Sequence, residues 1–473
     1  MKLVDEFTGR IVEDRKWRSG LQTAVEAKEG LEIQSEGHIL NAISLQHFIT
    51  RYPKRVGMTA TAQTAANEFM NSYGLGVVVI PPNKPCRRVG HPDEVFTTQA
   101  AKIQAIVEEI QRAHRAGQPI LLGTRTVRES ENLASIIRKS GIPCQMLNAK
   151  NDELEADIIA RAGMPGAITI STNMAGRGTD IVLGGPDGQD REPVIRAGGL
   201  YVIGTNRHES LRVDRQLRGR AGRQGDIGHS RFFISLEDEL MVKYRLKEIL
   251  PRRFRNLPEG QKIEDKRIHL FIQHIQEVIE DQTSEMRRTL MLYSDLVEKQ
   301  RQLIQGERQQ LLLKAGYLEE HFDIKAKNIP VEKLKTVALF QYGRLWAEHL
   351  DYLQQVRDCI HLIRFGGQKP LLEFQRLADR QFQLLCDRID EAVREKAALL
   401  LANPGLELQE LGVRRPSSTW TYIVNDNPFG NKLATMLLDN SNIGFQVDFV
   451  SAAVLFVVGV FQKLTGWKRA QHP

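Results

Sequence analysis

Short apolar runs alternate with amphipathic stretches between about residues 88 and 240, and this alternation limits the fold more than any other feature of the sequence. Runs rich in Ile, Leu and Val predict buried strands, whereas an apolar residue at every third or fourth position predicts a helix. Strands that alternate with helices form a parallel sheet with helices on its faces, so the sequence predicts an α/β domain. The expected strands span 119–123, 144–147, 167–171, 200–203 and 230–235, and the expected helices span 102–116 and 130–140.

The strand pattern stops at about residue 241, and helical patterns follow. Residues 266–314 are charged, periodically apolar and free of Gly and Pro before Gly306, which predicts one extended helix that lies against other domains. Residues 333–365 and 371–401 predict a helical hairpin, because a Gly-Gly pair separates them. We therefore expect an all-α region after the α/β domain.

Composition narrows the class of protein without naming a partner. A net charge of +7 fits an anionic partner, whether nucleic acid, acidic lipid or a nucleotide, and it also fits a basic surface kept for solubility. The four cysteines form no CxxC pair and have no His at ligand spacing, which argues against a zinc site and a disulfide framework and fits a reducing cytoplasm. The N-terminus lacks the apolar core of a signal peptide. We expect a cytoplasmic chain.

The strongest functional signal is the arginine-rich segment at residues 216–225, Gln-Leu-Arg-Gly-Arg-Ala-Gly-Arg-Gln-Gly. A QxxGRxGR pattern after an α/β domain is typical of the arginine element of superfamily 2 motor ATPases. A guanidinium stays charged and contacts two phosphate oxygens at once, so it suits the stabilisation of charge on a transferring phosphoryl group. We expect Arg220 and Arg223 to be catalytic; the alternative is an exposed basic loop.

A glycine-containing loop at residues 171–180, Ser-Thr-Asn-Met-Ala-Gly-Arg-Gly-Thr-Asp, directly follows an expected strand. Open α/β sheets bind ligands where their strands end, and the polar groups of such a loop can bond to ribose and phosphate. We expect Gly176, Arg177, Gly178 and Asp180 to bind a cofactor, with Asp180 accepting hydrogen bonds from ribose hydroxyls. Such a loop alone is weak evidence, and its spacing to the arginine segment strengthens it.

Several further segments of the chain have a distinctive wording: VDEFTGR at 4–10, Trp17 through AVEAKEG at 24–30, GMTATA at 57–62, TNMAGRGTDIVLGG at 172–185, GGLYVIGTNRHES at 198–210 and QLRGRAGRQGDIGHSRFFISLEDELM at 216–241. Almost letter by letter and in the same order, they resemble the SecA family of protein-export motors, and the resemblance covers roughly residues 1–400. In the helical region, LYSDLVEKQ at 292–300 resembles the scaffold helix of that family, and WAEHL at 346–350, IHLIR at 360–364 and QKP at 368–370 resemble its two-helix finger.

The resemblance implies an ATP-driven motor whose nucleotide lies between two RecA-like domains. It implies that Arg177 and Asp180 belong to the nucleotide-contacting loop of the second domain, and that Arg220 and Arg223 reach the nucleotide from that domain. It also implies a coupling element at residues 57–62, in which Gly57, Thr59 and Thr61 match the family and Ala60 replaces its usual Gly. This Ala is expected to stiffen the turn, because Gly reaches backbone angles that Ala avoids.

The chain departs from the family at the other side of the nucleotide. No Gly-Lys dipeptide occurs, so the sequence has no GxxxxGK[ST] loop to cradle phosphates. No apolar strand ends in an Asp-Glu pair that would hold Mg²⁺; Asp5-Glu6 follows only Leu3 and Val4. We expect the front of the first motor domain, the preprotein-binding domain and the zinc-binding tail to be missing. ATP is the expected cofactor, with Mg²⁺ only if another chain supplies that half, and the isolated chain should hydrolyse ATP hardly at all.

These patterns divide the chain into six expected parts. They are a remnant of the first motor domain (1–84), the second RecA-like motor domain (85–240), a helical scaffold with a reduced wing (241–329), the two-helix finger (330–402), a linker (403–448) and a short apolar segment with a basic flank (449–461). The last segment is too short to span a membrane. It is a membrane-surface anchor that favours acidic lipid, a helix docked on protein, or a sequence that is not natively used.

Three functions stay open at this point. The chain is a SecA-type translocase subunit, peripheral at the inner face of the plasma membrane, with the Sec channel, preproteins and a second chain with the phosphate loop as partners. Otherwise it is a non-hydrolysing adaptor of the channel, or half of a nucleic-acid helicase. Nucleic acid is the least expected partner, because no aromatic residues are interleaved with a basic groove.

Some further residues favour structural roles. His208-Glu209 is expected to be a packing and hydrogen-bonding pair, and the stripe formed by Trp346, Leu350 and Leu353 is expected to be core. We expect no metal site; His349 and His361 show no ligand spacing.

Overall fold

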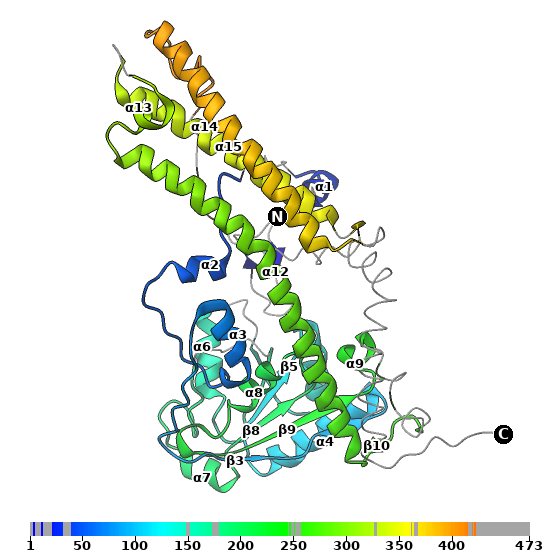
Figure 1. The fold of residues 1–473 in the computed structure, drawn as a ribbon. Coiled ribbons are helices and arrows are strands. Elements are labelled where there is room, and N and C mark those ends of the chain that lie inside the picture. Colours follow the sequence, from blue (N-terminus) through cyan, green and yellow to red (C-terminus); the bar gives the residue numbers. More distant parts are fainter. Residues whose placement is uncertain are drawn as a thin grey trace, which may run out of the picture. The chain divides into compact units, whose positions relative to one another are not determined.

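The structure is a computed structural model, and the chain forms two compact units. The first unit comprises the described residues among 57–283 and the paired strands β1 (Leu3–Val4) and β2 (Ile11–Val12); the second comprises those among 16–56 and 284–431 (Figure 1). The described residues are 3–4, 11–12, 21–31, 39–147, 152–172, 179–244, 246, 250, 257–325, 329–360, 362–363, 368–414, 419 and 421.

An eight-stranded sheet is the centre of the first unit, and strands β8 and β9 run through its middle (Figure 1). The order is β10-β4-β9-β8-β5-β7-β6, and β3 also pairs with β9. All pairs are parallel except the one between β10 and β4. The strands are β3 (Arg87–Gly90), β4 (Glu94–Phe96), β5 (Ile120–Thr124), β6 (Gln145–Leu147), β7 (Ile168–Thr172), β8 (Leu200–Gly204), β9 (Ile227–Ser235) and β10 (Lys262–Ile263).

Helices cover both faces of this sheet. On one face, α4 and α5 bury Ile110 and Ile137 against Ile120 and Ile170. On the other face, α8 and the first turns of α12 pack against Leu121 and Val202. Because both faces are covered, the central strands β5, β7 and β8 are buried along their whole length. The helices of this unit are η1 (Gln63–Ala65), α3 (Ala66–Tyr73), α4 (Gln99–Arg115), α5 (Val127–Lys139), α6 (Asp152–Arg161), α7 (Arg191–Arg196), α8 (Leu211–Arg218) and α9 (Glu239–Lys243).

The structure confirms the α/β domain and each of its predicted strands and helices. Residues 75–80 (Leu-Gly-Val-Val-Val-Ile) are also rich in β-branched side chains, but they form no strand with any described residue. The side chains of Val78 and Ile80 are 83% and 84% exposed. The run has the composition of a strand without a neighbouring strand to pair with.

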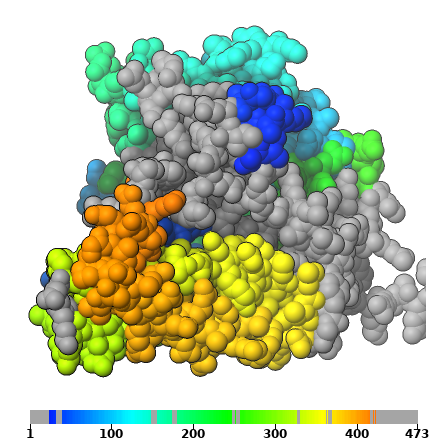
Figure 2. Space-filling model, turned by 90° about the horizontal axis from the view of Figure 1, so that it is seen from above, coloured from blue at the N-terminus to red at the C-terminus, as the bar shows by residue number. Residues whose placement is uncertain are grey.

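The second unit is helical, as predicted. The predicted extended helix is α12 (Arg267–Leu313), whose first part belongs to the first unit and whose remainder belongs to the second. The predicted hairpin is formed by α14 (Val331–Cys359) and α15 (Pro370–Ala402), which pack along each other in yellow and orange in Figure 2. The remaining helices of this unit are α1 (Leu21–Lys28), α2 (Leu45–Thr50) and α13 (Tyr317–Phe322).

The hairpin core confirms the predicted apolar stripe of α14. Trp346 and Leu353 are 1% and 4% exposed, and Leu350 packs beside them. The indole nitrogen of Trp346 donates to Oδ1 of Asn41, which ties the segment before α2 to this core. Leu411, just beyond α15, is buried in the same cluster as Trp346. None of the helices that the structure describes has both the length and the apolar composition needed to cross a membrane, and residues 449–461 lie outside the described part.

Candidate functional site

Helix α8 carries the arginine-rich segment. One face of the helix buries Val213 and Leu217 together with the carboxylate of Asp214, and this face fixes the helix against the sheet. The chain leaves α8 at Gly219 and passes through Arg220 and Ala221 into the short 3₁₀ turn η2 (Arg223–Gly225) before β9 begins. The segment is therefore a tight connection between a buried helix end and a central strand.

The backbone of this connection requires glycine. Gly222 has a φ of +70°, and a Cβ placed there would lie 2.6 Å from Cβ of Arg88. The guanidinium of Arg88 in turn donates to the carbonyl oxygen of Ala221 at 3.2 Å. Gln224 adopts a φ of 49° without being glycine, a conformation that costs about 1 kcal/mol or more. The backbone is therefore strained in the connection that carries Arg220 and Arg223.

The two arginines meet the end of the predicted nucleotide loop. Nη1 of Arg220 and Nη1 of Arg223 donate to the carbonyl oxygen of Thr179 at 3.3 and 3.2 Å. Nη1 of Arg223 also donates to Oδ1 of Asp180 at 2.7 Å. The structure therefore brings together three of the predicted site residues, Arg220, Arg223 and Asp180. Gly176, Arg177 and Gly178 lie outside the described residues.

The Arg223–Asp180 ion pair lies at the surface. The side chains are 37% and 60% exposed, and an ion pair in such a setting contributes at most about 1 kcal/mol. A phosphate, which carries more charge than a carboxylate, could replace Asp180 as the partner of Arg223 at little energetic cost. The geometry suits an arginine that changes partner when an anion arrives.

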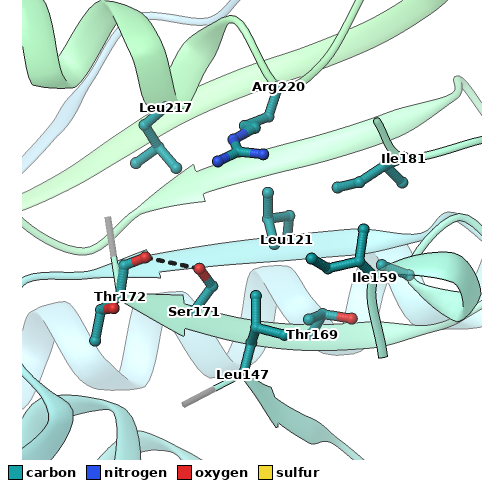
Figure 3. Close-up of a pocket in the computed structure, with 10 residues that line it drawn as sticks. Leu121, Leu147, Ile159, Thr169, Ser171, Thr172, Ile181, Leu217 and Arg220 are labelled. Carbon is teal, nitrogen blue, oxygen red and sulfur yellow. Dashed lines mark hydrogen bonds between the residues drawn. The ribbon is translucent and has the colours of Figure 1, made fainter. Parts of the chain in front are cut away.

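A small space lies beside Arg220, with the arginine on one side and Ser171 and Thr172 on the other (Figure 3). The hydroxyl of Ser171 donates to the carbonyl oxygen of Thr172 at 2.7 Å, and Oγ1 of Thr172 is buried without a hydrogen-bond partner in the described part of the chain. The enclosed part of the space has room for about one water molecule. A nucleotide would have to bind outside it, against the exposed side of the arginines.

The predicted coupling residues form a separate turn. The hydroxyls of Thr59 and Thr61 lie 3.2 Å apart, and the Thr61 amide donates to Oγ1 of Thr59 at 3.3 Å. Thr61 is buried, whereas Gly57 has nothing within 4 Å of where a Cβ would lie. These contacts involve only the turn and the start of η1, so a role in coupling the nucleotide of the first motor domain to movement remains a prediction.

A buried cluster of charged side chains next to α8 was not predicted from the sequence. Arg207 binds Asp93 and donates to Oδ2 of Asp214 at 3.0 Å, and Arg218 donates to Oδ1 of Asp93 at 2.9 Å. Both guanidinium groups lie over the ring of Phe232, at 4.8 and 4.5 Å from its centroid. The cluster joins the start and the end of α8 to the sheet.

The protonation of this cluster follows from its burial and its charges. Burial raises the pKa of Asp214, and the guanidinium of Arg207 opposes that rise. Burial works to lower the pKa of Arg207, but Asp93 and Asp214 outweigh it and raise the pKa above its ordinary value. Arg207 therefore stays cationic. Removing one member of such a buried set costs about 3–5 kcal/mol, because an unpaired charge is left behind.

His208 and Glu209, which follow Arg207, form hydrogen bonds with different helices. The His208 amide donates to Oδ1 of Asp214 at 3.0 Å, and Nζ of Lys243 donates to Oε1 of Glu209 at 2.7 Å. The described residues contain no group of three or more His, Cys, Asp or Glu side chains placed to hold a metal ion.

Models of three protein-family domains match successive parts of the chain. The SecA DEAD-like domain matches residues 4–70, the SecA P-loop domain matches 85–192 and 187–254, and the SecA Wing and Scaffold domain matches 262–328 and 316–399. The chain belongs to the SecA family. It corresponds to the C-terminal region of SecA, although the residues matched by the P-loop model contain no GxxxxGK[ST] sequence.

Curated relatives of this chain belong to the same family. The protein translocase subunit SecA of Mycobacterium avium is 43% identical over 449 residues, which make up 92% of this chain and 58% of that protein. SecA 2 of Corynebacterium diphtheriae is 42% identical over 442 residues, or 91% and 57%. SecA 2 of Mycobacterium tuberculosis is 43% identical over 449 residues, or 92% and 55%. The chain thus spans little more than half the length of these relatives.

Among solved structures, domain 2 of the DEAD-box helicase Mss116p bound to an RNA duplex is 20% identical and covers 48% of this chain and 77% of that one, with a TM-score of 0.25. An overlap this small supports no functional argument. The RecA-like fold of the SecA chain rests on its own parallel strand order and helix placement.

Proposed function

We propose that this chain supplies the arginine side of a SecA-type motor for ATP-driven protein export. The observation that carries the proposal is the convergence of Arg220 and Arg223 on Asp180 at the end of the nucleotide loop. Two guanidinium groups held at one exposed edge of an α/β domain suit the neutralisation of phosphate oxygens. The curated relatives are named as protein translocase subunits, which fits export as the use of that chemistry.

The residues present fit the phosphates of ATP and not its Mg²⁺ ion. Arg220 and Arg223 would contact phosphate oxygens, and Arg223 would leave Asp180 to do so. The sequence offers no GxxxxGK[ST] loop, and its Asp5-Glu6 pair follows only the two-residue strand β1, not a longer apolar strand. These parts have to come from other residues, in the same polypeptide or in a second chain, and Mg²⁺ would be held there.

The proposed partners follow from the same function. We propose that the motor acts on preproteins at the Sec channel, on the inner face of the plasma membrane. The long helix α12 and the α14–α15 hairpin would be the parts that respond to nucleotide. Acidic lipid would bind through residues 449–473, which lie outside the described part.

Reconstituted ATP hydrolysis tests the proposal. The purified chain should show almost no hydrolysis alone and substantial hydrolysis with a SecA chain that carries the GxxxxGK[ST] half. Arg223→Ala should then lower kcat at least about 100-fold, because charge on the phosphoryl oxygens loses its stabiliser. Arg115→Ala is the matched control, since Arg115 lies exposed at the end of α4 in the same unit.

Other outcomes would favour the other two functions. Robust hydrolysis by the clean chain alone would contradict the need for other residues with the phosphate loop, and full activity of Arg223→Ala in the complex would contradict the arginine role. Co-purification with the channel without any phosphate-loop chain would point to a non-hydrolysing adaptor. Binding to RNA or DNA with a steep salt dependence would point to a helicase half.

A further inference from the structure

Gln276 is a polar residue in the apolar row by which α12 packs on the sheet. Ile272, Ile275 and Ile279 on the same helix are buried in the core of the first unit, and Gln276 is 0% exposed among them. A buried amide is costly unless it is hydrogen-bonded, and a Leu or Met would fill the same space at no such cost. The buried amide of Gln276 therefore requires a hydrogen-bond partner.

One partner of Gln276 lies just before α8, and the other is Asp214 near the middle of that helix. Nε2 of Gln276 donates to the carbonyl oxygen of His208 at 2.7 Å and to Oδ2 of Asp214 at 2.9 Å. Both partners are acceptors, so they fix which end of the amide faces them. Oε1 of Gln276 is buried and has no hydrogen-bond partner in the described part of the chain. The side chain therefore leaves one polar atom unsatisfied in order to direct its nitrogen at α8.

A second contact lies one helical turn further along α12. The hydroxyl of Ser210, which precedes α8, lies 3.3 Å from Oε1 of Glu280 and donates to it. Residues four apart occupy the same face of a helix. Gln276 and Glu280 therefore both form hydrogen bonds to residues 208–214, at the beginning of α8. The other end of α8 is held by the pairing of Arg218 with Asp93.

We propose that Gln276 is a positioning residue that sets the orientation of α8 and, through it, of Arg220 and Arg223. This inference rests on the proposed function, because it gives those arginines a role to be positioned for. Asp214 lies near the middle of α8, and the arginines follow directly after the helix ends. A tilt of the helix about Asp214 displaces both guanidinium groups. Because α12 continues into the second unit, Gln276 also joins the arginine segment to the helix that leads there.

Hydrogen–deuterium exchange of the full chain tests the inference without any hydrolysis. Gln276→Met keeps the volume and removes both donors. The amides of residues 211–225 should then exchange about tenfold faster, the change expected when a hydrogen bond to a buried charge is lost, while the amides of β5 and β7 stay unchanged. Gln273→Met is the matched control, because Gln273 is an exposed glutamine on the same helix.

A charge exchange separates positioning from simple loss of packing. Gln276→Glu places a second carboxylate against Asp214 and should speed exchange at least as much as Gln276→Met. Combining it with Asp214→Asn removes the carboxylate–carboxylate repulsion, so exchange should be slower in the double variant than in the worse single variant if the pairing matters. If Gln276→Met matches Gln273→Met, or if the double variant is no better than the worse single variant, the inference is wrong.

Hydrolysis in the reconstituted complex completes the test. Gln276→Met should lower kcat about tenfold and leave KM unchanged, since it misplaces groups that act in the transition state. If Arg223→Ala leaves hydrolysis intact while Gln276→Met loosens residues 211–225, the proposed function fails and the positioning contact stands. If Arg223→Ala abolishes hydrolysis and Gln276→Met changes neither exchange nor kcat, the positioning role fails alone.

Discussion

Arg223 and Asp180 stand 43 positions apart in the sequence, and Nη1 of the arginine lies 2.7 Å from Oδ1 of the carboxylate. The arginine-rich connection and the loop after β7 thus meet at one edge of the first unit. The proposed chemistry requires that Arg223 exchange one anionic partner for another, and an exposed carboxylate is a partner that a phosphate would replace at little cost. This pairing leads directly to a prediction about stability.

Asp180→Asn should lower the free energy of unfolding by less than about 1 kcal/mol, because the ion pair is largely exposed to water. Urea unfolding of the full chain measures the effect. Asp214→Asn, at a carboxylate that is 2% exposed, is the contrasting variant and should cost several times as much. A loss above 2 kcal/mol for Asp180→Asn would mean that the pair is a structural element and not a replaceable contact.

Gly222→Ala should destabilise the first unit by about 1–3 kcal/mol and displace the arginine segment. The added Cβ meets Arg88 at 2.6 Å, and a φ of +70° is unfavourable for alanine. Gly90→Ala, at the end of β3 where nothing lies within 4 Å of the new Cβ, should change stability little. Equal urea midpoints for the two variants would contradict this account of the connection.

The central strands could be predicted because they are buried on both faces and are therefore rich in apolar and β-branched residues. β7 and β8 are examples. The edge elements gave no such signal. β3 has the sequence Arg-Arg-Val-Gly and forms because the first part of β9 is left open by β4, which pairs only with residues 233–235 of that strand. Residues 75–80 show the converse, since a strand-like composition without a described pairing partner stays exposed. Composition indicates burial, but pairing decides whether a strand forms.

The candidate site could be predicted in part for a related reason. Arg220 and Arg223 lie in a local pattern whose chemistry depends on residue type and spacing. Asp214 and Gln276 could not be found in this way, because they are 62 residues apart and neither belongs to a local motif. Helix α8 was also missed, since its buried face includes a carboxylate that looks solvent-exposed in a sequence pattern. Only the fold shows that Arg207 neutralises it.

Val79→Lys should reduce aggregation of the purified chain without a change in stability. Val78, Val79 and Ile80 are 83%, 66% and 84% exposed, and contiguous exposed β-branched residues favour association between chains. Because Val79 is exposed, we expect the free energy of unfolding to stay within about 0.5 kcal/mol of the wild type. Light scattering over time measures the gain. Asn83→Lys adds the same charge nearby but leaves the apolar run intact. It should therefore reduce aggregation less than Val79→Lys if the apolar run causes the association.

His349 should make the second unit sensitive to acid. Its Nε2 lies 2.9 Å from Oε1 of Gln300, whose Nε2 donates to the carbonyl oxygen of Ala378 at 3.2 Å. Gln300 therefore accepts from the imidazole through its carbonyl oxygen, so the ring carries its proton on Nε2. Nδ1 is buried without a partner among the described residues, and the imidazole ring contacts the rings of Trp346 and Phe382. A second proton would place a charge in this apolar setting.

Burial lowers the pKa of His349 from 6.5 to about 4. Below pH 6.5 the unfolded chain takes up a proton that the folded chain refuses, so stability is complete above that pH and is lost as the pH falls towards 4. The loss approaches about 3 kcal/mol, since each pKa unit corresponds to about 1.4 kcal/mol. Urea unfolding at pH 7, 5.5 and 4.5 should show His349→Asn weakened at pH 7 but losing less than the wild type on acidification. His321→Asn, at a side chain that is 40% exposed, should keep the wild-type profile. Parallel profiles for His349→Asn and the wild type would show that this imidazole is not the acid-sensitive group.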